Sequence, residues 1–174
     1  MGDEEPGFEI EHGHEDYSAE ELLEQARANA QATVIATAGF LHARGVPLAE
    51  WAAALGALFA RGWDEPRPWD AGEFLDAMLT NYRAMGAAVE SVALGEVRAE
   101  AVTTGFPDPD LCALFGVEVT VAAAFNDATA AIAAQRGLAW TWDLDGARTR
   151  YLVVATGDGS AGAGGDPPTA ETGA

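Results

Sequence analysis

The strongest constraint on the fold is an alternating segment near the C-terminal end, in which residues 138–144 and 147–155 flank Asp145-Gly146. Asp-Gly between two alternating apolar runs is typical of a two-residue type I′ turn, so the segment predicts a β-hairpin. A loop of that length pairs Leu144 with Ala147, Trp142 with Thr149 and Trp140 with Tyr151.

Because strand side chains alternate between two faces, this hairpin has one mainly aromatic and apolar face. That face carries Leu138, Trp140, Trp142, Tyr151 and Val153. On the opposite face, the expected pairing joins Asp143 to Arg148 and Thr141 to Arg150.

The N-terminal half of the chain has the signals of helices. Ser18 and Glu21 have the spacing of a capping box, so a helix should begin there and continue to about residue 43, before Gly45. A stripe of apolar and small residues at helical spacing consists of Leu22, Ala26, Ala30, Thr33, Thr37 and Leu41, with Leu23, Val34 and Phe40 beside it.

Two further helices follow, over about 48–61 and 70–85. We expect the second helix to turn Trp51, Leu55, Leu58 and Phe59 inward. The apolar face of the third consists of Phe74, Leu75, Met78, Leu79 and Tyr82.

At residue 88, the spacing of hydrophobic residues changes from the helical period of about 3.6 residues to a period of two, which is typical of strands. Residues 88–94 and 97–104 predict a second hairpin around Gly95-Glu96, followed by a short helix over 111–115 and a longer one over 118–136. Two hairpins with helices on one face predict an α+β domain with a four-stranded, mainly antiparallel sheet, spanning residues 18–156. Residues 1–17 are expected to form a disordered acidic leader, and residues 157–174 a disordered tail rich in Gly, Ala and Pro.

The charge of the chain restricts its partners. All nine basic residues are arginine, 28 residues are acidic, and the formal net charge is -19. A negatively charged surface repels nucleic acids and anionic membranes, so neither is an expected partner. Both a high-salt, halophilic cytosol and the codon bias of a GC-rich genome account for the missing lysine. Without a signal peptide or a membrane-spanning segment in the sequence, we expect a cytoplasmic location.

No catalytic or cofactor motif stands out in the sequence, and we expect neither a cofactor nor a metal. Cys112 near a helix start is a weak candidate nucleophile and His42 a weak candidate base, although a buried apolar cysteine and a helix-capping histidine are the preferred interpretations. His12 and His14 lie in an acidic run, but their spacing is not that of a helical zinc site.

The aromatic face of the C-terminal hairpin is the best candidate for a binding site. Trp140, Trp142 and Tyr151, opposite Tyr82 and Met78 of the third helix, could line a pocket for a small apolar molecule. The alternative is an ordinary core, which these residue types favour, but tryptophan with an indole N–H to satisfy is not a usual core residue, so the pocket is retained. The sequence therefore favours a small-molecule-binding or regulatory domain whose ligand is unknown.

The C-terminal half also has the layout of a known family. A strand ending in Gly105-Phe106-Pro107, a short helix ending in Phe115-Gly116, a longer helix and a hairpin turning at Asp145-Gly146 follow one another within roughly residues 85–155. This order resembles the L-2-amino-thiazoline-4-carboxylic acid hydrolase-like family and the related 4-vinyl reductase small-molecule-binding domains. Those families have cysteines before that proline and in the last strand, where this chain has Gly105 and a polar residue near Thr149.

The resemblance implies a shared fold from which the family's thiol chemistry has been lost. It leaves a hydrolase of the amino-thiazoline carboxylate type, using Cys112 or His42, as an alternative function. A third alternative is a structural protein that works through a partner, with an exposed patch around Trp51 and Leu55. A homodimer is compatible with any of these functions.

Overall fold

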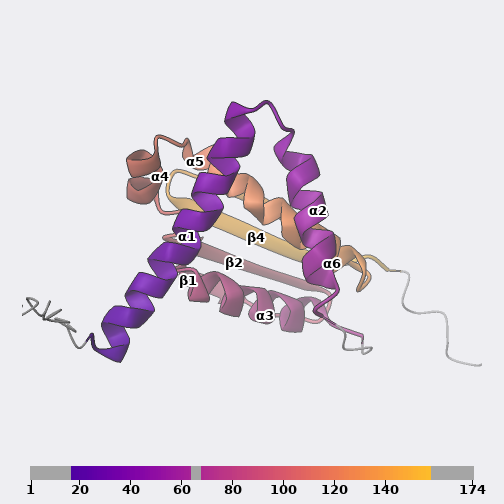
Figure 1. The fold of residues 1–174 in the computed structure, drawn as a ribbon. Helices are drawn as coiled ribbons and strands as arrows, with labels where there is room; N and C mark the ends of the chain where they lie inside the picture. Colours follow the sequence, from indigo (N-terminus) through magenta and orange to yellow (C-terminus); the bar gives the residue numbers. More distant parts are fainter. Residues whose placement is uncertain (1–16, 64–67, 158–174) are drawn as a thin grey trace, which may run out of the picture.

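The computed structural model describes residues 17–63 and 68–157 (Figure 1). The predicted leader, with its two histidines, and the predicted tail lie almost entirely outside the described residues. In chain order, the described elements are α1 (Ala19–Ala43), α2 (Leu48–Ala60), α3 (Ala71–Ala84), β1 (Ala88–Ala93), β2 (Arg98–Thr104), α4 (Pro109–Phe115), α5 (Val119–Ala123), the 3₁₀ helix η1 (Ala124–Asp127), α6 (Ala128–Ala134), β3 (Leu138–Asp145) and β4 (Arg148–Ala155).

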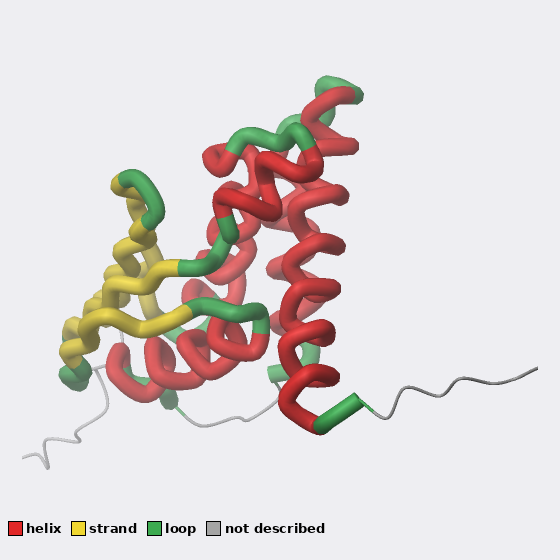
Figure 2. Tube along the Cα trace, turned by 90° about the vertical axis from the view of Figure 1, so that its left-hand side faces the viewer, coloured by secondary structure: helices red, strands yellow, loops and turns green. Residues whose placement is uncertain are grey.

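The predicted α+β architecture is confirmed. Both hairpins belong to one antiparallel sheet with the strand order β1-β2-β4-β3. The helices gather on one face of this sheet, and α1 lies on the side of the helical layer away from the strands (Figure 2). Since only one face is covered, the strands bury alternate residues, as in Ala99, Ala101 and Thr103 of β2.

Local capping explains where several helices begin. The Ser18 side chain accepts a hydrogen bond from the Glu21 backbone N–H at 3.2 Å, and the Glu21 carboxylate accepts one from the Ser18 backbone N–H at 2.8 Å. Asp70 caps α3 by accepting from the Glu73 N–H at 2.7 Å. These bonds satisfy backbone donors that have no partner within the helix.

The C-terminal hairpin forms, but its predicted register is wrong by two residues. Trp142 lies opposite Tyr151, and Asp145 pairs with Arg148, so the turn consists of Gly146 and Ala147. Only Gly146 has a positive φ, of 61°, which fits a type II′ turn and excludes type I′. A shift of two residues keeps every side chain on its predicted face, because the period of a strand is two.

On the outer face of the sheet, the register shift changes the charge pairs. Asp143 lies opposite Arg150 and not Arg148, and Thr141 lies opposite Leu152. Arg148 forms an ion pair with Glu90 of β1 at 2.8 Å. Both partners are largely exposed, so this pair contributes little to stability.

The core lies between α3, α6 and the inner face of the sheet. All five residues of the predicted α3 face are buried. The prediction for α2 is wrong at two positions, because Leu58 and Phe59 are exposed while Ala52, Gly56 and Ala60 are buried. Small residues face inward because α2 packs against α6 at very close range: a Cβ atom on Gly56 would lie 2.9 Å from Ala131 Cβ.

The helix predicted over residues 118–136 is divided into α5, η1 and α6. The buried residues Phe125 and Asn126 lie in the 3₁₀ segment. Among the described residues, no single helix is both long and apolar enough to cross a bilayer; α4 and residues 119–134 meet that criterion only as a pair bent by 110°.

Helix α1 contacts the body with a different face from the apolar stripe in its sequence. Its buried residues are Gln31, Ile35 and Ala38, whereas Leu22 and Phe40 are exposed. The Gln31 side chain donates to Gly105 O at 2.7 Å and accepts from the Asp108 N–H at 2.9 Å. This polar contact fixes the middle of α1 against the loop between β2 and α4.

Candidate functional site

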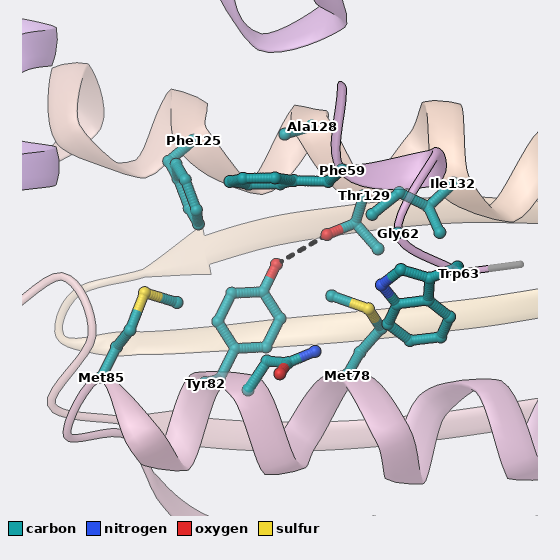
Figure 3. Close-up of a pocket in the computed structure, with 11 residues that line it drawn as sticks. Phe59, Gly62, Trp63, Met78, Tyr82, Met85, Phe125, Ala128, Thr129 and Ile132 are labelled. Carbon is teal, nitrogen blue, oxygen red and sulfur yellow. Dashed lines mark hydrogen bonds between the residues drawn. The ribbon is translucent and has the colours of Figure 1, made fainter. Parts of the chain in front are cut away.

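A cavity of about 390 Å³ lies between the end of α2, one face of α3, and the η1–α6 segment (Figure 3). Its volume is within the range of small-molecule sites. Its wall is formed by Phe59, Gly62, Trp63, Met78, Asn81, Tyr82, Met85, Phe125, Ala128, Thr129 and Ile132. Phe59, Gly62 and Asn81 are exposed, so the cavity opens to solvent between α2 and α3.

Two hydroxyl groups form the polar part of the inner wall. The Tyr82 hydroxyl and Thr129 Oγ1 are 3.0 Å apart and share a hydrogen bond between α3 and α6 (Figure 3). Two hydroxyls carry two protons, and their mutual bond uses one of them, so one donor remains for a bound molecule. Burial raises the pKa of Tyr82 well above its usual value, so its hydroxyl keeps its proton at neutral pH.

Of the five residues predicted to bind a ligand, Met78 and Tyr82 line this cavity. Trp140 and Tyr151 are buried behind Tyr82, in a stack with ring-centroid distances of 4.9 Å for Tyr82–Tyr151 and 5.0 Å for Tyr151–Trp140. Trp142 is half-buried farther along β3, where its indole N–H donates to the Asp127 carboxylate at 2.6 Å. These three residues are absent from the cavity wall, and the first two support it from behind.

Asn126 connects the aromatic stack to the helical wall. Its backbone carbonyl accepts from the Trp140 indole N–H at 3.0 Å, and its side-chain oxygen accepts from the Tyr151 hydroxyl at 3.3 Å. These bonds satisfy the polar ends of two buried aromatic side chains. They also hold η1, and with it Phe125 of the cavity wall, against the sheet.

Arg136 fixes the opposite end of the cavity. Its guanidinium donates to Trp63 O and to Ile132 O, and it lies 5.3 Å from the centre of the Trp63 ring. A guanidinium over an indole face is a favourable cation–π arrangement. Arg136, which follows the end of α6, therefore positions Trp63, which follows the end of α2.

Neither of the two weak catalytic candidates, Cys112 and His42, lies at the cavity, and neither has the surroundings that a catalytic residue requires. Cys112 is buried beside Ile35 and Ala122, and no described residue forms a hydrogen bond with its thiol. Burial, and secondarily the charge of Asp108, raises the pKa of Cys112, which disfavours the thiolate that a nucleophile requires. His42 is exposed in the last turn of α1.

The described residues give no support to a metal centre, since no group of three or more His, Cys, Asp and Glu side chains among them is placed to hold an ion. The patch expected around Trp51 and Leu55 is half-buried against the core. The cavity wall itself carries no ionisable group apart from the Tyr82 hydroxyl.

Sequence reasoning missed most of the cavity wall. Trp63 lies between two predicted helices, where the sequence predicts no element, and Phe59 is expected in the core. One signal did point to the inner wall: Asn126 and Thr129 are polar residues inside a mostly apolar helical run. Buried polar residues in such a run need specific partners, and here those partners are Tyr151, Trp140 and Tyr82.

Comparisons with known proteins identified no matching family model, no similar curated protein and no similar solved structure.

Proposed function

We propose that this protein is a small-molecule-binding domain whose ligand occupies the cavity between α2, α3 and α6. The observation that carries the proposal is the cavity itself: about 390 Å³ of space with mainly apolar walls, one buried hydroxyl pair, and the exposed Asn81. Ligand sites in proteins combine a mainly apolar lining with a few polar groups that fix orientation. The described residues offer no acid, base or nucleophile at this wall, so binding without catalysis is the simplest function.

The wall favours a particular class of ligand. A charged group buried there would have no counter-ion among the lining side chains, so the buried part of the ligand is uncharged. The free proton of the Tyr82–Thr129 pair selects a hydrogen-bond acceptor, such as a carbonyl oxygen. The expected ligand is therefore apolar and carries one neutral acceptor.

A matched pair of probes tests this chemistry. Calorimetric titration with 2-acetylnaphthalene and with 2-ethylnaphthalene compares molecules of similar size with and without a carbonyl group. A neutral hydrogen bond is worth about 1 kcal/mol, so the ketone should bind about fivefold more tightly. In the double variant Tyr82→Phe/Thr129→Val, which loses both hydroxyls and keeps the side-chain shapes, the two probes should bind equally.

A second pair of variants tests the location. Met85→Trp places a large ring in the cavity and should abolish binding. Ala84→Trp adds the same ring at an exposed position one residue earlier and should leave binding unchanged. Binding that survives Met85→Trp would place the ligand elsewhere. Failure of both probes to bind the native protein would refute the proposed ligand class.

A further inference from the structure

Much of the apolar face of α1 is left without a partner in the fold. The stripe of Leu22, Ala26, Ala30, Thr33, Thr37 and Leu41 lies on a different side of the helix from Gln31, Ile35 and Ala38. Leu22, Ala26 and Thr33 are exposed, whereas Ala30, Thr37 and Leu41 are half-buried, and Val34 beside the stripe packs against the core. Leu22, Leu23 and Phe40 are 56%, 49% and 58% exposed.

The N-terminal end of α1 also stands clear of the rest of the fold (Figures 1 and 2). Every residue of the helix before Arg27 is exposed. Helical stability in proteins comes mainly from packing of an apolar face, and the first two turns, with their two exposed leucines, lack that packing. A partner on this face would supply it.

The spacing of the stripe identifies the partner as a second copy of this chain. The intervals between its successive members are four, four, three, four and four residues, so the pattern is the same when read from either end. In an antiparallel pair related by a two-fold axis, Leu22 therefore meets Leu41 of the second copy, Ala26 meets Thr37, and Ala30 meets Thr33. A two-fold interface requires this kind of self-complementary surface.

The charges on α1 fit the same arrangement. Its first turn is acidic, with Glu20 and Glu21, and its C-terminal end is basic, with His42 in the last turn and Arg44 as the cap. The antiparallel register places Arg44, which lies over the Phe40 ring on this face, beside the acidic first turn of the second copy. The two helix dipoles are then also opposed, which is favourable.

We infer that two copies of this protein associate through an antiparallel α1–α1 contact centred between Gln31 and Ala32. A helix of this length is about 37 Å long and offers a face about 10 Å wide, or roughly 370 Å² of projected area per copy. Two such faces bury roughly 740 Å² in total, which is small for a protein–protein interface, so the dimer is weak and reversible. The inference is independent of the proposed ligand cavity, which α1 does not line.

Sedimentation of the full chain between about 1 and 300 µM measures this association. The experiment is run in about 1 M KCl, because both chains are acidic and salt screens their repulsion. The native protein should change from monomer to dimer over that range. Leu22→Glu should remain monomeric, because it places an unpaired charge in the contact. The matched control Leu58→Glu, at a position on α2 that is 57% exposed, should dimerise like the native protein.

Crosslinking tests the orientation. The only native cysteine, Cys112, is buried, so an introduced cysteine is the reactive thiol. In the antiparallel pair, the two copies of residue 30 lie about 5 Å apart along the helix axes, and the two copies of residue 22 about 28 Å apart. A short bismaleimide should therefore link Ala30→Cys to itself and leave Leu22→Cys unlinked.

Three results would overturn the inference. A native protein that stays monomeric at every concentration has no such interface. Equal dimerisation of Leu22→Glu and Leu58→Glu places the interface elsewhere. Self-linking of Leu22→Cys shows that the helices pair in parallel.

Discussion

Replacing Gly56 by alanine should destabilise this protein, although the same change usually stabilises a helix interior. Gly56 lies in the middle of α2, where alanine is favoured over glycine by about 1 kcal/mol. Here the added methyl group points at α6. It would lie 2.9 Å from Ala131 Cβ and 3.0 Å from the Ala128 carbonyl carbon, with the Ala128 oxygen closer still.

The magnitude follows from these distances. Carbon atoms pack at about 3.5–4.0 Å, so α2 and α6 must separate by about 1 Å to admit the methyl group. Backbone atoms cannot rotate away as a side chain can, which puts the cost near the upper end of the overpacking range, at about 3 kcal/mol. After subtraction of the helix-propensity gain, Gly56→Ala should lower the free energy of unfolding by about 2 kcal/mol, and Tm by about 8 °C.

Two glycine variants provide graded controls in the same thermal-unfolding assay. A methyl group on Gly39 of α1 would meet the Val117 side chain, which can move, so Gly39→Ala should cost less. A methyl group on Gly62 would meet only Phe59 O, at 3.4 Å, so Gly62→Ala should be close to neutral. If Gly56→Ala is as stable as the native protein, α2 and α6 do not pack as closely as these distances indicate.

Four other predictions concern the core and the surface. Burial raises the pKa of Tyr151 to about 12. Because the folded state holds this proton more tightly than the unfolded state, Tyr151 should lower the free energy of unfolding by about 1.4 kcal/mol per pH unit from pH 10 towards 12. In denaturation curves, Tyr151→Phe should reduce the slope by this amount and leave the contribution of Tyr82, whose pKa is also raised. Cys112 should react with a thiol reagent such as dithionitrobenzoate only when the protein unfolds, and rapid labelling of the native protein would contradict its burial. Gln31→Leu should cost about 3 kcal/mol in urea denaturation, because Gly105 O and the Asp108 N–H lose their partner, and a cost near zero would show that solvent replaces the bridge. Stability should rise with KCl up to molar concentrations, because salt screens repulsion among the 28 acidic residues, and a flat salt series would favour codon bias as the origin of the composition.

Local sequence patterns were enough to predict the type and order of most secondary-structure elements, although the helix expected over 118–136 is divided into three. The Ser18–Glu21 capping box, the Asp70 cap and the change of hydrophobic period after residue 86 depend on contacts within a few residues, and each predicted its element close to its observed bounds. The faces of α3 and of the C-terminal hairpin could also be predicted, because a single strong apolar face left one choice of orientation.

Tertiary structure decided which surface each remaining element buries and where the cavity lies. Helix α1 has an apolar stripe, yet the fold uses the side with Gln31, because that side chain bonds to the backbone at Gly105 and Asp108, far away in sequence. Helix α2 turns Gly56 inward and not Leu58, because α6 approaches too closely for a larger residue. The cavity depends on the same approach, since its walls come from three separate segments. The pattern of hydrophobic residues along one segment cannot encode the distance between two helices, because that distance is set only when separate segments pack together.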